Sequence, residues 1–239
     1  MNNTFFIDTT LCTACRGCQV ACKQWHDLPA EQTVNRGSYQ NPEDLSFDTY
    51  KLVRMQETVV DGQLRWLFFP DQCRHCLEPP CRDTAVDPAA IFKDERTGAV
   101  IYTAKSKHLD AAEILESCPY NIPRKASDGT LAKCDMCYDR VFNGLQPACV
   151  KVCPTGAMNF GERGEMISLA NARLGMVKKK FPKAALLDPD DLQVIFMVAF
   201  EPNRYHEFAV ASAVAIDITR QVALKRMLRP LAKVGARLL

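Results

Sequence analysis

Twelve cysteines in short, regular runs limit the structures open to this 239-residue chain. The first run has the spacing C-x2-C-x2-C-x3-C, and the last has C-x2-C-x11-C-x3-C with a proline directly after it. In chain order the cysteines are Cys12, Cys15, Cys18 and Cys22; Cys73, Cys76 and Cys81; Cys118; and Cys134, Cys137, Cys149 and Cys153. So many closely spaced thiols indicate metal ligation.

The spacing favours iron–sulfur clusters over the other uses of cysteine. A C-x2-C-x2-C-x3-C run is the bacterial signature of a [4Fe–4S] cluster, and its fourth cysteine ligates the other cluster of a pair. Disulfides fit less well, because the first residues lack the features of an export signal and intracellular thiols stay reduced. Zinc is the alternative, although it usually takes separate C-x2-C pairs rather than a run of three close cysteines.

Crossed ligation assigns the cysteines to three [4Fe–4S] clusters. A loop with three close cysteines reaches three iron corners of a cluster, so the fourth thiolate must come from another part of the chain. The helix that leaves such a loop carries its own cysteine to a second cluster. The assigned sets are Cys12, Cys15, Cys18 and Cys153 for centre I; Cys22, Cys134, Cys137 and Cys149 for centre II; and Cys73, Cys76, Cys81 and Cys118 for centre III.

The order of the runs predicts an α+β, loop-rich fold of two nested bacterial-ferredoxin-like modules with short β-hairpins and a C-terminal helical extension. Residues 1–64 and 126–165 are expected to form the outer module with two clusters, and residues 65–125 an inserted module with one. Residues 166–239 are expected to form a helix–strand–helix extension, in which the final helix begins near residue 203.

Two hairpins are predicted from apolar runs on either side of turn residues. The first turn is Asp61-Gly62, a dipeptide typical of tight hairpins. The second spans residues 94–98 and precedes a short helix that leads to Cys118.

Charge and hydropathy limit the partners. The net charge is +2, so no polyelectrolyte such as nucleic acid is expected as a partner. The apolar stretch at residues 208–216 is too short to cross a bilayer, so no transmembrane helix is expected. After Asp217 the tail is basic and amphipathic. We expect it to pack on a partner protein, with an anionic membrane surface or a further subunit as alternatives.

Basic residues and one histidine lie within or beside the cysteine runs. Arg74 and Lys133 are among the basic residues. Cations near a cluster raise its reduction potential, but most charged side chains are exposed, so we expect surface or partner contacts here. His75 lies between two cysteines of centre III, which already has four thiolates. A supporting polar role is therefore expected for His75 rather than ligation.

Four segments around the cysteines carry a family resemblance: CTACRGCQVACKQWHDLPAE, WLFFPDQCRHCLEPPC, SCPYNIPR and KCDMCYDRVFNGLQPACVKVCPTGAMNFG. They resemble the iron–sulfur (beta) subunit of molybdenum- or tungsten-dependent formate dehydrogenases, especially the soluble two-subunit enzymes of sulfate-reducing bacteria. The resemblance covers nearly the whole chain. The wider family includes the electron-transfer subunits of many molybdopterin oxidoreductases.

The resemblance implies a subunit that relays electrons and has no catalytic site of its own. Its partner would be a catalytic (alpha) subunit with a molybdenum or tungsten bis-pterin site, and its acceptor a multihaem cytochrome, another redox subunit or a quinone-linked membrane protein. Co-export with a signal-bearing partner would place it in the periplasm, with the cytoplasm as the alternative. Two other functions remain open: a subunit of a molybdopterin reductase acting on sulfur or nitrogen oxides, and a zinc-binding structural scaffold.

The sequence departs from the four-cluster pattern of larger family members. In that pattern the inserted module also holds a crossed pair. Four of the positions where it would have cysteines hold Ala85, His108, Ala111 and Ile114. These are the four ligands that a single cluster would use under crossed ligation. The departure therefore predicts three clusters rather than four.

Overall fold

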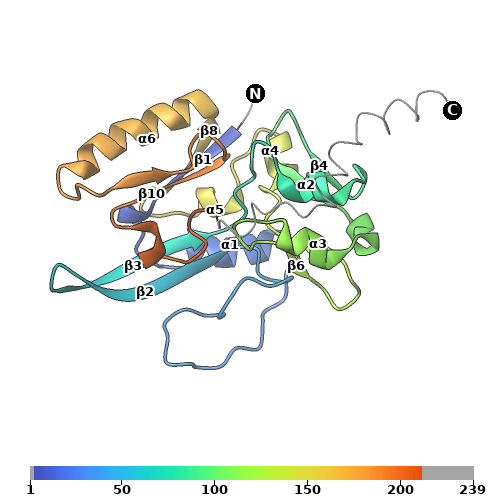
Figure 1. The fold of residues 1–239 in the computed structure, drawn as a ribbon, viewed down its shortest axis with the longest axis horizontal. Helices are drawn as coiled ribbons and strands as arrows, with labels where there is room; N and C mark the ends of the chain where they lie inside the picture. The colour runs from blue at the N-terminus through green and yellow to red at the C-terminus, as the bar shows by residue number, and fades with distance from the viewer. Residues whose placement is uncertain (1–2, 212–239) are drawn as a thin grey trace.

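The computed structural model describes residues 3–211. A four-stranded sheet with strand order β8-β1-β10-β9 lies on one side of the molecule under helix α6, and short helices lie on the other (Figure 1). The bounds are β1 Asn3–Asp8, β8 Met158–Glu162, α6 Arg163–Lys178, β9 Ala185–Leu187 and β10 Val194–Val198. Strand β1 pairs parallel with β10 and antiparallel with β8, and β10 pairs antiparallel with β9.

The two central strands are buried on both faces, which explains their continuous apolar sequences. On one face Phe5 and Phe196 belong to the largest apolar cluster of the described residues. On the other face Phe6 and Met197 pack beneath α6. Helix α6 begins after Glu162, whose carboxylate accepts the first free N–H groups of the helix.

The hairpin of β2 (Leu52–Val60) and β3 (Gln63–Asp71) extends from this core (Figure 1). Its turn residues Asp61 and Gly62 both have positive φ, at 50° and 74°, as a tight hairpin turn of this kind requires. The predicted turn is therefore confirmed. The inner end of the hairpin is buried, where Phe69 stacks on Phe196 with ring centroids 4.2 Å apart.

The other elements are short and surround the cysteine runs. Strands β4 and β5, and strands β6 and β7, form two small antiparallel pairs. The α+β class predicted from the sequence is confirmed. The bounds are η1 Thr9–Leu11, α1 Gly17–Trp25, α2 Pro80–Ala85, β4 Ile91–Lys93, β5 Val100–Tyr102, η2 Ala104–His108, α3 Ala111–Glu116, β6 Arg124–Lys125, β7 Leu131–Ala132, α4 Tyr138–Phe142, α5 Ala148–Lys151 and η3 Pro202–Arg204.

The C-terminal region differs in part from the prediction. The expected helix and strand are present as α6 and β10, and β10 lies between β1 and β9 in the sheet. The expected start of a final helix at residue 203 is wrong, because residues 205–211 form turns and bends after η3. There the Tyr205 hydroxyl accepts the Ala199 N–H at 3.1 Å, and the Phe208 carbonyl accepts the Arg74 guanidinium at 3.3 Å.

These contacts hold the chain against the core instead of allowing a straight helix. The rest of the expected helix and the basic tail lie outside the described residues. Within residues 3–211, no helix combines the length and hydrophobicity that crossing a bilayer requires.

Candidate metal centres

Each C-x2-C loop contains a residue in the left-handed backbone conformation, which makes the chain turn sharply between the two cysteines. Ala14, Arg16, His75 and Met136 have φ between 47° and 68°. In two loops this conformation directs an N–H toward a sulfur: His75 N lies 3.4 Å from Cys73 Sγ, and Met136 N lies 3.5 Å from Cys134 Sγ. Loops that point successive N–H groups inward form concave sites for anions, including iron–sulfur clusters.

The four cysteines assigned to centre I line one hollow. Cys12 follows η1, Cys15 lies in the loop before α1, Cys18 lies in the first turn of α1, and Cys153 lies in the loop between α5 and β8. The hollow therefore brings together residues that are about 140 positions apart in the sequence, Cys12 and Cys153. Cys15 is exposed, so this hollow lies close to the surface.

The four cysteines assigned to centre III line a second hollow. Cys81 lies in α2, Cys118 follows α3, and the loop after β3 supplies Cys73 and Cys76. Burial raises the pKa of the Cys118 thiol to about 12. The Tyr102 hydroxyl is buried without a hydrogen-bond partner within bonding distance among the described residues. Burial, and then the charge of Cys81, raise the pKa of Tyr102 well above its usual value.

Of the cysteines assigned to centre II, two lie in helices and two lie in the loop between β7 and α4, and the four are electrostatic neighbours. Cys22 lies in α1 and Cys149 in α5, and Cys137 immediately precedes α4. Burial, and then Cys149 and Cys137, raise the pKa of Cys22. Burial and Cys22 likewise raise the pKa of Cys134. Burial raises the pKa of Cys137 to about 12, with Cys149 as the next cause.

The donor sets fit iron–sulfur clusters. All twelve cysteines are free thiols. A thiolate ligand must lose its proton, and buried neighbouring thiolates repel one another, so a cationic core is needed to hold them. An iron–sulfur core supplies that positive charge and accepts or donates one electron. The neighbouring N–H groups and left-handed loops stabilise the negative charge that remains.

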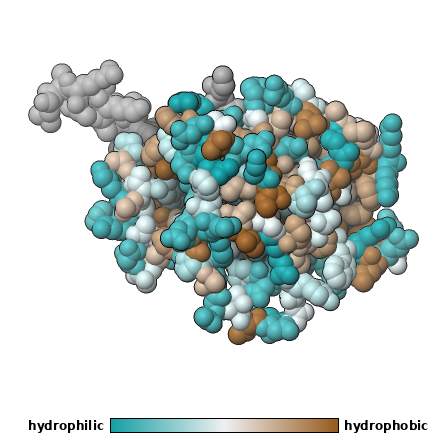
Figure 2. Space-filling model, turned by 180° about the vertical axis from the view of Figure 1, so that it is seen from behind, coloured by the Kyte–Doolittle hydropathy of each residue, from teal (hydrophilic) through white to brown (hydrophobic). Residues whose placement is uncertain are grey.

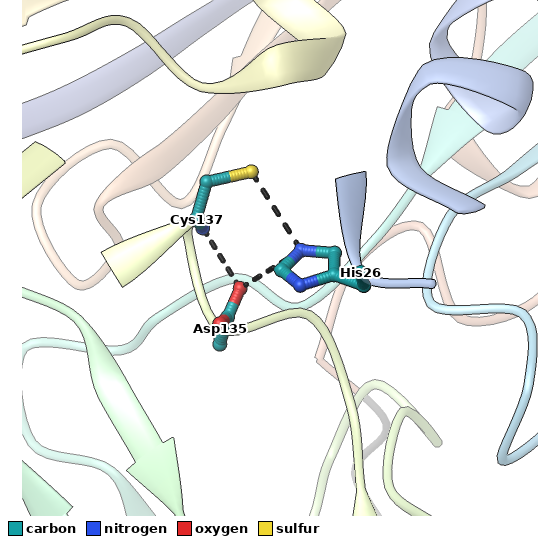
Figure 3. Close-up of side chains that lie close together, drawn as sticks. All are labelled: His26, Asp135 and Cys137. Atoms are coloured by element: carbon teal, nitrogen blue, oxygen red, sulfur yellow. Dashed lines mark hydrogen bonds and ion pairs between the residues drawn. The ribbon is translucent and has the colours of Figure 1, made fainter. Parts of the chain in front are cut away.

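His26, Asp135 and Cys137 form a contact that the sequence did not predict (Figure 3). The His26 Nε2 atom lies 3.3 Å from Asp135 Oδ1 and 3.7 Å from Cys137 Sγ. The same Asp135 oxygen accepts the Cys137 N–H at 2.8 Å. A nitrogen that faces a carboxylate and a sulfur is best occupied by a proton, so His26 supports the assigned ligand Cys137 and does not form a separate metal site.

His75 is fully buried, and its Nδ1 accepts the Val100 N–H at 2.9 Å. This bond places the ring proton on Nε2. Burial, followed by the charges of Lys133 and Lys93, lowers the pKa of His75 well below its usual value. The neutral ring thus ties the centre III loop to β5.

Two of the flanking cations are buried, contrary to the sequence expectation of exposed surface. Arg74 is 1% exposed and Lys133 is 6% exposed. Arg74 Nη1 donates to Asp71 Oδ1 at 2.6 Å, and Arg54 Nε donates to Asp71 Oδ2 at 2.8 Å. Arg74 can be buried because the fully buried Asp71 carboxylate compensates the charges of the Arg54 and Arg74 guanidinium groups. Sequence periodicity carries no signal for such a pair.

The place where a fourth cluster would have its ligands is packed with apolar side chains. Ala85, Ala111 and Ile114 belong to one apolar cluster, together with Ile91 and Leu131. The fourth position, His108, is exposed at the end of η2. These four positions supply no thiolate, and three of them are occupied by packed apolar side chains.

Comparison with known proteins agrees with the site chemistry. A family model described as a 4Fe-4S dicluster domain matches residues 64–163. The formate dehydrogenase subunit beta of Megalodesulfovibrio gigas is 57% identical over 215 residues, which cover 88% of this chain and 100% of that protein. The formate dehydrogenase 2 subunit beta (cytochrome c-553) of Nitratidesulfovibrio vulgaris is 54% identical, over 87% of this chain and 99% of that protein.

A more distant relative is similar over almost the whole chain. The iron-sulfur subunit of the nitrate-inducible formate dehydrogenase of Escherichia coli is 34% identical over 236 residues, covering 96% of this chain and 79% of that protein. These relatives from three organisms are all described as beta or iron-sulfur subunits of formate dehydrogenases. The chain belongs to the family of formate dehydrogenase beta (iron–sulfur) subunits.

Proposed function

We propose that this chain relays single electrons through three [4Fe–4S] clusters between the catalytic subunit of a formate dehydrogenase and an external acceptor. The observation that carries the proposal is the gathering of twelve free thiols into three four-cysteine sets. Each set supplies the four thiolates that one such cluster requires. Centre III has its full set in the inserted segment, and the apolar packing of Ala85, Ala111 and Ile114 supports a count of three.

The assigned ligand sets support the nested arrangement of modules, because centres I and II each take cysteines from both the first and the last cysteine run. Cys18 and Cys22 lie four residues apart in α1, which is about one helical turn, or roughly 5–6 Å. One faces the hollow of centre I and the other lies among the thiols of centre II. Helix α1 therefore fixes the spacing between these two centres, and residues 1–64 and 126–165 act as one outer module around the insert.

Surface exposure supports centre I as one end of the relay. Cys15 is exposed, and the nearby Val152 side chain is 43% exposed. Apolar residues also appear among polar ones over the rear face of the molecule (Figure 2). Exposed apolar side chains beside a redox centre suit contact with a protein partner. The catalytic partner would hold molybdenum or tungsten in a bis-pterin site, and the acceptor is a cytochrome or a further redox subunit.

Formate-dependent reduction tests the proposal. The complex of this chain with its catalytic subunit, purified anaerobically, is mixed with formate, and the broad absorption near 400 nm is followed. We expect rapid bleaching in the complex and slow or no reduction of an added c-type cytochrome by the catalytic subunit alone. Equal cytochrome reduction with and without this chain would contradict a relay function.

A further inference from the structure

Two lysines are buried between the cysteine sets without an ion-pair partner. Lys51 is 2% exposed and Lys133 is 6% exposed. Lys51 Nζ donates to the Pro70 carbonyl at 3.1 Å and to Gln72 Oε1 at 2.5 Å. Among residues 3–211, neither lysine has a carboxylate oxygen within 4.0 Å of its Nζ. A buried ammonium without a counter-charge is costly, so negative charge is expected close to each.

Lys51 lies beside centre I and acts electrostatically on centre II as well. It is an electrostatic neighbour of Cys12 and Cys18 in centre I, and of Cys22 and Cys149 in centre II. Its acceptor Pro70 lines the hollow of centre I. The ammonium is therefore placed to interact with negative charge on either centre.

Lys133 lies between centres II and III. It lines the hollow of centre III and directly precedes Cys134, an assigned ligand of centre II. Its Nζ donates to the Val100 and Cys134 carbonyls, at 2.5 and 3.0 Å, and lies 4.8 Å from the Tyr102 ring centroid.

We propose that each lysine is a shared counter-charge for two neighbouring centres: Lys51 raises the reduction potentials of centres I and II, and Lys133 those of centres II and III. Reduction of a centre adds one electron and one negative charge, which a fixed nearby cation favours. Centre II is a neighbour of both lysines, so it is influenced by both charges. The lysines act on the centres through their charge and are not ligands of the clusters.

The contacts between sets agree with this arrangement. Among the thiols, Cys149 of centre II belongs to the apolar cluster against which Cys18 of centre I packs. Cys134 of centre II and Cys73 of centre III belong to a second apolar cluster. Centre II therefore borders both of the others.

The test is a redox titration monitored by electron paramagnetic resonance on the complete complex, and it rests on the proposed three clusters. The variants Cys15→Ala and Cys118→Ala identify the signals of centres I and III by their loss. Lys51→Met is expected to lower the potentials of centres I and II and leave centre III unchanged. Lys133→Met is expected to lower those of centres II and III and leave centre I unchanged. Each shift should be about tenfold in the reduced-to-oxidised ratio, or about 59 mV for one electron.

Lys51→Met should leave centre III unchanged, and Lys133→Met should leave centre I unchanged. Each variant therefore serves as the control for the other. Lys51→Arg and Lys133→Arg retain the charge and should keep potentials near those of the unaltered protein. Lys183→Met, at an exposed position, should shift none. If Lys133→Met loses a cluster on purification, Lys133→Gln, which keeps a donor for the two carbonyls, provides the same test.

Unchanged potentials in both variants, or equal shifts of all three centres in each, would overturn the inference. Iron analysis of the unaltered complex separates this failure from a failure of the proposed function. Fewer or more than three clusters would refute the proposed count, whereas three clusters with unmoved potentials would refute only the role of the lysines.

Discussion

Replacing Cys118 with alanine is expected to remove one cluster and leave two, lowering the iron content from about twelve to about eight atoms per chain. The reason is that Cys118 lines only the hollow of centre III, where the other three thiols come from Cys73, Cys76 and Cys81. A cluster with one corner unligated by the protein is lost or degraded. Iron and acid-labile sulfide, measured on anaerobically purified protein, check this result.

Ser117→Ala is the matched control, because it alters the neighbouring residue without touching a thiol. The Ser117 hydroxyl donates to the Ile114 carbonyl at 2.8 Å, so its removal costs a local hydrogen bond only. The control should retain all its iron. If Cys118→Ala instead removes the signals assigned to centres I and II, the grouping of ligands is incorrect.

Asp71→Asn is expected to reduce the free energy of unfolding by about 3–5 kcal/mol. The Asp71 carboxylate is fully buried and accepts from both Arg54 and Arg74, which are 7% and 1% exposed. Burial alone would raise the pKa of Asp71, but the two arginines hold it below its usual value, so the group is a carboxylate in the folded protein. Neutralising it leaves two buried guanidinium groups undercompensated. The arginines are also tied to the core, because Arg74 lies 4.8 Å from the Phe196 ring centroid.

Urea unfolding under anaerobic conditions measures the effect, with loss of the visible absorption as a second probe. Asp61→Asn, at the exposed turn of the β2–β3 hairpin, is the control and should stay within about 0.5 kcal/mol of the unaltered protein. Equal stability of the two variants would show that the buried network contributes little.

Cysteine spacing and turn residues were sufficient to predict much of this fold. The C-x2-C runs indicated iron–sulfur chemistry and a family, because three close thiolates in one loop suit few other purposes. Asp61-Gly62 predicted its hairpin turn because both residues readily adopt positive φ. The apolar run at residues 194–200 predicted a strand, and the structure has β10 there at Val194–Val198.

Other features depend on long-range packing and left no local signal. Lys51 and Lys133 resemble ordinary surface lysines in the sequence, and only the folded chain places them between cysteine sets. The contact of His26 with Cys137 joins residues 111 positions apart. The expected helix from residue 203 followed helical propensity, whereas the contacts of Tyr205 and Phe208 with the core fix a turn instead.

Three cubane clusters held by the twelve cysteines are the basis of the whole account, and metal analysis of the anaerobically purified chain measures them most directly. We predict about twelve iron atoms and about twelve acid-labile sulfides per chain, without stoichiometric zinc. About sixteen or about eight iron atoms, or zinc in place of iron, would contradict it.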